Sequence, residues 1–279
     1  MRAALYQMTA GPDPAKNAAD LALAVSEAAA GGADILLTPE VSNCLGAPRA
    51  LQRELLHPEE TDPTLAAVQS AARDAGIWVL LGSLALQSGS VDGRFANRSI
   101  LLDATGTIRA RYDKIHMFDV ALSDTETYTE SAAYRPGDRA VVAKTPFATF
   151  GLSICYDLRF PHLYRRLAKA GANVLTVPSA FARVTGAAHW HTLLRARAIE
   201  TGCFVVAPAQ VGTHGESGSG PRQTYGHSLV VSPWGEVIVD AGSACGITFV
   251  DLDLADVGHS RTRVPSLGHD RVFDGPEQA

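Results

Sequence analysis

Apolar residues along this chain fall into short continuous runs that alternate with longer segments of helical periodicity. Such runs are typical of buried strands, and in the first half they occupy residues 3–8, 33–40 and 77–83. The segments between them, residues 13–32 and 62–76, each begin with an Asp-Pro pair, which caps a helix and fills its first position. The pattern therefore predicts alternating strands and helices, and hence an α/β fold.

The second half of the chain repeats this order after a predicted hairpin at residues 95–113. Strands and helices alternate there, at residues 147–155, 160–171, 172–179, 187–202 and 203–209. The stretch GADILLTPE (32–40) aligns without gaps with GANVLTVPS (171–179), each after a helix. This similarity predicts an internal duplication, with two similar sheets packed together and helices outside. Chance similarity of one short strand is the alternative.

Two segments lie outside this regular pattern. Residues 211–224, rich in glycine and serine, predict a flexible loop that acts as a lid or a partner contact. Residues 255–279 are polar and interrupted by proline and glycine. We therefore expect one domain over residues 1–254 and a C-terminal tail, 255–279, that packs on a partner subunit.

Composition and charge narrow the class of protein. The chain has 279 residues and a net charge of −5, with scattered arginines, so nothing indicates a nucleic-acid partner. No apolar run approaches the roughly 18 residues that span a bilayer, so we expect no membrane partner. The N-terminal segment reads as a strand and not as a signal peptide, and the four cysteines show no paired spacing. We expect reduced thiols and a cytoplasmic location.

The histidines do not indicate a metal site. His189 and His191 are two residues apart on a predicted helix and therefore point to different faces. His227 precedes an apolar run, where it is expected to open a strand and to serve in packing. No cysteine spacing matches a metal site either.

Three polar residues follow directly on predicted strands: Glu40, Lys114 and Cys155. Side chains at the carboxyl ends of strands meet in a crevice in α/β folds, so the fold could bring these three together. Taken singly, each has an ordinary explanation: a solvated carboxylate, a surface partner of Asp113, and a small buried thiol. The alternative for Cys155 is a nucleophile that the preceding strand presents at an exposed tip.

Together, the segments LLTPE, RYDKIH and GLSICYDLRFP resemble the three catalytic segments of the nitrilase, or carbon–nitrogen hydrolase, superfamily, in the same order. GAAHWHTLLRARAIETGCFVVAPAQ and YGHSLVVSPWGEVI extend the resemblance over about residues 3–254. It implies a four-layer αββα sandwich and a homodimer or higher homo-oligomer. Within the superfamily, the chain looks most like the branch of omega-amidases and deaminated-glutathione amidases.

The resemblance also implies roles for individual residues. Cys155 would be the nucleophile, Glu40 the general base and acid, Lys114 the cation beside the oxyanion, and Glu130 a second glutamate that supports the lysine and the leaving group. The reaction expected is hydrolysis of a small carboxylate-bearing amide by water, to acid and ammonia through a thioester, with no metal or organic cofactor.

For substrate binding, the expected residues are Tyr156, whose backbone N–H would face the oxyanion, Phe181 as an apolar wall, and Arg159 or Arg183 as the partner of a carboxylate. A surface ion pair is the alternative for either arginine. Deaminated glutathione is the expected substrate.

Other functions stay open. They are an omega-amidase acting on alpha-ketoglutaramate, an N-carbamoyl amidohydrolase, a Cys–His hydrolase and an inactive scaffold. A nitrilase is disfavoured because Tyr156–Asp157 follows the cysteine where nitrilases generally carry Trp–Glu.

Overall fold

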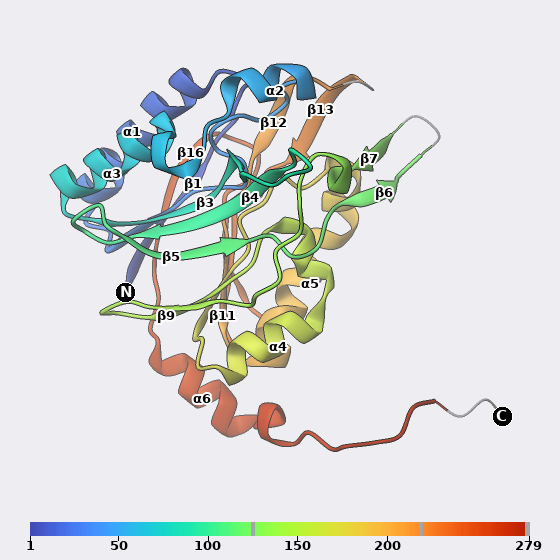
Figure 1. The fold of residues 1–279 in the computed structure, drawn as a ribbon. Helices are drawn as coiled ribbons and strands as arrows, with labels where there is room; N and C mark the ends of the chain where they lie inside the picture. The colour runs from blue at the N-terminus through green and yellow to red at the C-terminus, as the bar shows by residue number, and fades with distance from the viewer. Residues whose placement is uncertain (124–125, 218–219, 277–279) are drawn as a thin grey trace.

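The computed structural model describes residues 1–123, 126–217 and 220–276. Two six-stranded sheets form the centre of the molecule (Figure 1). The first contains β1 (Arg2–Gln7), β2 (Ile35–Leu37), β3 (Trp78–Gln87), β4 (Phe95–Leu102), β5 (Ile108–Asp113) and β16 (Gly246–Asp251). The second contains β8 (Val142–Lys144), β9 (Thr149–Leu152), β10 (Val174–Thr176), β11 (Phe204–Ala207), β14 (Leu229–Val231) and β15 (Val237–Asp240).

Helices cover the outer face of each sheet. The main ones are α1 (Pro14–Ala30), α3 (Pro63–Ala75), α4 (Pro161–Lys169) and α5 (Arg183–Thr201). Shorter elements are α2 (Arg49–Leu55), α6 (Ala255–Arg263) and the 3₁₀ helices η1 (Glu59–Thr61), η2 (Glu130–Ala132), η3 (Cys155–Arg159) and η4 (Ser266–Gly268). Two hairpins lie outside the sheets: β6 (Asp119–Ala121) with β7 (Thr127–Thr129), and β12 (Val211–Ser217) with β13 (Gly220–Tyr225).

The layers follow from the way side chains alternate between the two faces of each strand. In β2, Ile35 and Leu37 face the second sheet and share a core with Phe150, whereas Leu36 faces outward and packs with Leu21 of α1. Successive side chains of a strand point to opposite faces, so both faces of this sheet are buried. On the far side, α4 and α5 cover the second sheet. The result is the predicted four-layer αββα sandwich.

The two sheets have the same strand order and the same parallel and antiparallel pairings, although the edge strand β16 ends the sequence of strands whereas its counterpart β8 directly precedes β9. The strand order is β16-β1-β2-β3-β4-β5 in one and β8-β9-β10-β11-β14-β15 in the other. β2 lies between parallel β1 and β3, and β10 lies between parallel β9 and β11. The outer strands pair antiparallel in both sheets. This repeated topology supports the predicted internal duplication.

Several predicted elements differ in their bounds. β2 ends at Leu37, short of the predicted end at residue 40, because Pro39 has no N–H to continue the ladder. β9 ends at Leu152, so Cys155 does not end a strand: it begins η3 and is buried. α5 begins at Arg183, earlier than predicted.

The prediction of a flexible loop over residues 211–224 was wrong for the described residues. β12 and β13 pair as an antiparallel hairpin, and the buried His214 side chain lies 2.6 Å from the Thr224 hydroxyl. Glycine and serine gave the segment a loop-like composition, but its buried polar side chains satisfy one another. Residues 218–219 lie outside the described residues. His227 does not open a strand, because β14 begins at Leu229.

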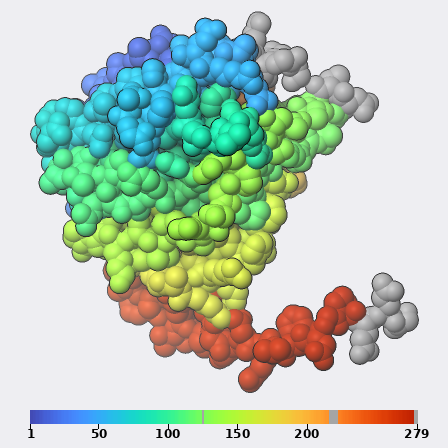
Figure 2. Space-filling model, in the orientation of Figure 1, coloured from blue at the N-terminus to red at the C-terminus, as the bar shows by residue number. Residues whose placement is uncertain are grey.

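The C-terminal residues begin as part of the body. Val257 of α6 enters the main core, and Arg261 donates hydrogen bonds to the carbonyl oxygens of Thr201 and Ala172. Farther on, Arg165 of α4 pairs with Asp270. Beyond this contact the chain extends away from the body (Figure 2). Among the described residues, no helix has the length and apolar character needed to cross a membrane.

Candidate active site

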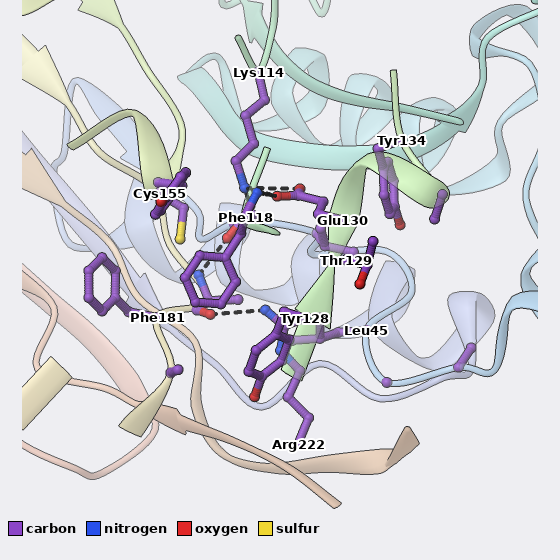
Figure 3. A pocket seen from close by; sticks show the side chains of 18 of the residues that line it. Leu45, Lys114, Phe118, Tyr128, Thr129, Glu130, Tyr134, Cys155, Phe181 and Arg222 are labelled. Atoms are coloured by element: carbon purple, nitrogen blue, oxygen red, sulfur yellow. Dashed lines mark hydrogen bonds and ion pairs between the residues drawn. The ribbon is translucent and has the colours of Figure 1, made fainter. Parts of the chain in front are cut away.

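A cavity of about 430 Å³ opens where the ends of several strands meet (Figure 3). Four polar residues line one part of it: Glu40 after β2, Lys114 after β5, Glu130 at the start of η2, and Cys155 at the start of η3. The fold thus brings together the three residues predicted from the strand ends, and the second glutamate with them.

Lys114 is the centre of this group. Its side chain is 2% exposed, and Nζ lies 2.9 Å from Oε1 of Glu40. The same nitrogen lies 2.9 and 2.8 Å from the two carboxylate oxygens of Glu130. A buried ammonium is costly unless it is paired and hydrogen-bonded, and here its hydrogen bonds all go to carboxylates.

The carboxylate oxygens have further donors. Asn97 Nδ2 of β4 donates to Oε1 of Glu40 at 2.9 Å, and the backbone N–H of Ala180 donates to Oε2 at 2.8 Å. The backbone N–H of Phe118 donates to Glu130 at 2.6 Å. Sequence reasoning missed Asn97, although an asparagine within the apolar run FANRSILL was a signal that could have found it.

The Lys114 contacts set the protonation of the group. Burial raises the pKa of Glu40, but the charge and hydrogen bond of Lys114 outweigh it and hold that pKa below its usual 4.5. Burial likewise lowers the pKa of Lys114, but the carboxylates of Glu130 and Glu40 raise it well above 10.5. Glu40 is therefore an ionised carboxylate and Lys114 an ammonium at neutral pH.

The Cys155 thiol has the opposite tendency. Burial, and then the negative charge of Glu40, raise the pKa of Cys155 far above its usual 9.0. At neutral pH the sulfur is a thiol beside an ionised carboxylate that can accept its proton. The backbone of Cys155 is in the left-handed region, with φ of 48°, and its N–H donates to the carbonyl oxygen of Pro178. Such a conformation is strained for a residue other than glycine.

A glycine lets the two halves of the site approach each other. A Cβ at Gly82 of β3 would lie 1.9 Å from the backbone oxygen of Thr38 and 2.5 Å from Cβ of Pro178. These two neighbours precede Glu40 and Ala180, the partners in the hydrogen bond between the halves. No side chain fits at residue 82 without moving them apart.

Asp157 connects the Cys155 turn with the Lys114 segment. This carboxylate is fully buried and accepts a hydrogen bond from the Tyr112 hydroxyl at 2.6 Å and one from the backbone N–H of His116 at 3.0 Å. It also accepts from the backbone N–H of Ile154 at 2.9 Å, and the His116 ring lies 2.7 Å away. Tyr112 and His116 flank Lys114, and Ile154 precedes Cys155, so Asp157 fixes the distance between the two segments.

The predicted substrate-binding residues divide into two groups. Tyr156 and Phe181 line the cavity. Arg159 and Arg183 do not: Arg159 lies beside His189, and Arg183, exposed in the first turn of α5, donates to Gln223. Arg159 is nevertheless adjacent to the cavity, because its guanidinium lies over the rings of Tyr156 and Phe181, 5.8 and 5.5 Å from their centroids. The role of either arginine as the partner of a substrate carboxylate stays a prediction.

Two other arginines line the cavity, Arg222 of β13 and Arg49 of α2. Arg222 donates to the carbonyl oxygen of Ala180 at 3.0 Å, and its guanidinium lies over the Tyr128 ring. Sequence reasoning missed Arg222 because it lies in the segment interpreted as a loop. Nothing in the local sequence around Arg49 distinguishes it from a surface arginine.

The architecture and this group of residues are those of a carbon–nitrogen hydrolase. The model of the carbon-nitrogen hydrolase family matches residues 2–262, and the chain belongs to that family. It is a hydrolase acting on carbon–nitrogen bonds. The chain is 38% identical over 269 residues to the deaminated glutathione amidase of Yersinia enterocolitica, covering 96% of this chain and 92% of that protein. It is also 38% identical to the human deaminated glutathione amidase, covering 96% and 81%.

Solved structures of related proteins have the same fold as this chain. The NitFhit protein of C. elegans superposes with a TM-score of 0.89 at 36% identity, over 97% of this chain and 65% of that one. Nit3 of Saccharomyces cerevisiae, a member of the nitrilase superfamily, has a TM-score of 0.82 at 27% identity, over 95% and 94%. A variant of the Nesterenkonia sp. AN1 amidase carries the acetamide moiety of fluoroacetamide on its active-site cysteine, with a TM-score of 0.77 at 29% identity over 94% of each chain.

Replacing the Asp157 carboxylate by an amide tests its positioning role. In Asp157→Asn, one of the oxygens that hold Tyr112, His116 and Ile154 becomes a donor, so Cys155 and Lys114 shift relative to each other. We expect kcat to fall about tenfold to a hundredfold, since small misplacements cost that much, with KM nearly unchanged. Tyr112→Phe should give a smaller fall in kcat. Tyr164→Phe is the control, because this buried hydroxyl contacts Ser153 instead; an equal loss there would contradict the assignment.

The protonation states predict the pH profile of kcat/KM. Glu40 acts as the ionised carboxylate, and its pKa in the folded protein lies below the usual 4.5. It is protonated only when the pH falls through that lowered pKa, so activity should fall only below about pH 4.5. Because the pKa values of Lys114 and Cys155 are raised, we expect a flat profile between about pH 6 and about pH 9. A tenfold rise per pH unit over that range would instead mean that a preformed thiolate attacks. Steady-state rates in constant-ionic-strength buffers measure this.

Proposed function

We propose that this protein is an amidase in which the Cys155 sulfur attacks the amide carbon, and that deaminated glutathione is its substrate. The observation that carries the proposal is the arrangement around Lys114: a buried cation between two carboxylates, beside a buried thiol, in a cavity that also presents arginines. Relatives at 37–39% identity named deaminated glutathione amidase support the choice of substrate.

In the first step, the Cys155 thiol transfers its proton to the Glu40 carboxylate as sulfur bonds to the amide carbon. The carbonyl oxygen becomes an oxyanion. Lys114 Nζ and the backbone N–H of Tyr156 are the donors for that oxygen, and a well-placed donor of this kind lowers the barrier by about 3–4 kcal/mol. Glu130 holds the Lys114 ammonium in place, because both of its oxygens lie within 2.9 Å of Nζ.

In the second step, the carbon–nitrogen bond breaks and the leaving amine takes the proton from Glu40, which restores the carboxylate. The acyl group is now a thioester on Cys155. Glu40 then accepts a proton from a water molecule as the water attacks the thioester, and gives it back to the departing sulfur. The free acid leaves, and thiol and carboxylate return to their initial states.

The chemistry of the substrate decides the leaving group. In deaminated glutathione, a 2-oxo acid is joined through its side-chain amide to the dipeptide cysteinylglycine. Hydrolysis therefore releases cysteinylglycine, not the ammonia expected from the sequence, which is released from alpha-ketoglutaramate. The substrate has a carboxylate at each end, and the cavity has two arginines, Arg222 and Arg49, that can pair with them.

Three broader statements belong to the same proposal. We assign residues 1–254 to one hydrolase domain, on which α6 also packs through Val257 and Arg261, and propose that the part of the tail beyond Asp270 packs on a second copy of the chain. Exposed Val272 and Phe273 in the part that extends from the body support this. The cysteines at positions 44, 155, 203 and 245 are all free, as expected in the cytoplasm.

Removal of the nucleophile tests the reaction. Cys155→Ala should abolish release of cysteinylglycine from deaminated glutathione and of ammonia from alpha-ketoglutaramate, because no thioester can form. Cys245→Ala, which removes an exposed thiol, should retain full activity. Chromatography of the products gives both rates, and circular dichroism checks the fold. A folded Cys155→Ala variant that still turns over would overturn the assignment. A higher kcat/KM for alpha-ketoglutaramate would make the protein an omega-amidase.

Arg222 can be tested against Arg183, which lies outside the cavity. Arg222→Gln removes a cation that would pair with a substrate carboxylate, so KM for deaminated glutathione should rise about tenfold to a hundredfold, as for the loss of a charged hydrogen bond. Arg183→Gln should change KM by less than about twofold, because an exposed surface contact contributes little binding energy. Equal effects of the two variants would contradict the role of Arg222.

A further inference from the structure

A second group of polar residues lies away from the cavity. His191 of α5, His227 before β14 and Asp240 of β15 offer ligand atoms that all lie within 4.8 Å of one another. His191 Nε2 is 3.0 Å from Oδ2 of Asp240, and His227 Nδ1 is 2.8 Å from Oδ1. None of the three residues lines the cavity, and the proposed mechanism uses none of them.

The separations suit a shared metal ion. Bonds to zinc are about 2.0–2.1 Å for imidazole nitrogen and about 2.0–2.2 Å for carboxylate oxygen, which puts neighbouring ligands of a tetrahedral ion roughly 3.3 Å apart. The two nitrogen–oxygen distances, which go to different oxygens of Asp240, are shorter than this by a few tenths of an ångström. The ligand atoms as a group lie within 4.8 Å of one another, so side-chain rotation has to draw the three together around the ion. Each imidazole can present a bare nitrogen by carrying its proton on the other ring nitrogen.

The backbone holds His227 in a strained conformation. Within the described ranges, three residues other than glycine have positive φ: Val41 at 50°, Cys155 at 48° and His227 at 55°. Val41 directly follows Glu40, and Cys155 is the candidate nucleophile, so both belong to the cavity. Strain of this kind persists where the surroundings over-determine it, and it gathers at functional positions. His227 is the one such residue that the catalytic site does not explain.

The surroundings of His227 are rigid. Its N–H donates to the carbonyl oxygen of Gly242 at 2.7 Å, and its carbonyl oxygen accepts from the Trp190 indole at 2.8 Å. Its ring stacks on Tyr225 with centroids 4.4 Å apart. Asp240 is oriented by the N–H of Gly242, which donates to Oδ1 at 2.9 Å. His227 and Asp240 are thus positioned before any ion arrives, which lowers the cost of binding.

From this geometry we propose that His191, His227 and Asp240 bind a divalent transition-metal ion of the zinc type. Two imidazoles and one carboxylate are borderline ligands, which suit Zn²⁺, Co²⁺ or Ni²⁺ better than Ca²⁺ or Mg²⁺. All three side chains are about one-third exposed, so the ion can reach them and keep a water molecule in its remaining position.

The ion would join three elements that otherwise meet only through packing and hydrogen bonds. It would connect α5 to β15 and to the segment between β13 and β14. This junction supports the cavity wall, because Trp190 packs on Phe181 with ring centroids 5.0 Å apart and the N–H of Tyr225 donates to the Phe181 carbonyl. Metal binding should therefore stabilise the fold around that wall.

Titration with Co²⁺ and Zn²⁺ tests the proposal. The full chain, with Cys155 and Cys245 replaced by alanine to remove competing thiols, is freed of metal with a chelator. Co²⁺ should bind with one equivalent, give visible absorption typical of four- or five-coordination, and be displaced by Zn²⁺. Zn²⁺ should raise the melting temperature by several degrees, since a ligand that binds only the folded state stabilises it.

Variants distinguish the group from other surface ligands. His191→Ala and Asp240→Asn should each weaken Zn²⁺ binding at least a hundredfold and remove the thermal shift, with the metal-free melting temperature showing that each variant folds. His189→Ala is the matched control, because His189 lies on the same helix beside Arg159 and should bind Zn²⁺ normally. No binding at millimolar metal, or equal binding in all variants, would mean that the three residues form only a hydrogen-bonded network.

Discussion

The buried ammonium of Lys114 is the constraint on which this structure depends. Removing one cation and two carboxylates from water costs several kcal/mol per ion, and the mutual attraction offsets this only when geometry and hydrogen bonding are nearly complete. Completeness here needs Glu40, Glu130, Asn97 and the backbone N–H of Ala180, which come from distant parts of the chain. The complete group can form only when both sheets are in place. A partly folded arrangement that buries some of these charges without their partners therefore has to bear the desolvation cost alone.

The same charges divide the chemical work. The ammonium keeps the Glu40 carboxylate ionised, while burial and that carboxylate keep the Cys155 sulfur protonated. Many cysteine enzymes lower the thiol pKa to obtain a thiolate at rest. Here the sulfur rests as a protonated thiol, and Glu40, the proposed base, lies beside it as a carboxylate. In the proposed mechanism, nucleophilicity develops as the sulfur attacks, and Lys114 stabilises the charge that passes to the carbonyl oxygen.

The alternating apolar runs with Asp-Pro helix starts predicted the strands and helices, and the resemblance to carbon–nitrogen hydrolases supplied the four layers, which the structure has. The polar residues after predicted strands pointed to Glu40, Lys114 and Cys155, which the fold brings to one cavity, whereas Glu130 came from the resemblance alone and the catalytic roles are proposed. The sequence did not predict the detail of the Cys155 turn, because the left-handed φ and the contacts of Asp157 depend on residues far along the chain. For the same reason it missed Arg222, whose strand is held by buried polar contacts and not by apolar alternation.

The duplication explains why the site lies where it does. Glu40 follows β2 and Ala180 follows β10, so the two residues come from nearly equivalent positions of the two halves. One half supplies the carboxylate and the other supplies a backbone N–H that binds it, at 2.8 Å. Gly82 permits the contact, because a side chain there would meet the segments leading to both residues. Two sheets that pack face to face bring corresponding strand ends together, and serine at 179 against glutamate at 40 makes this junction asymmetric, with the carboxylate on one side only.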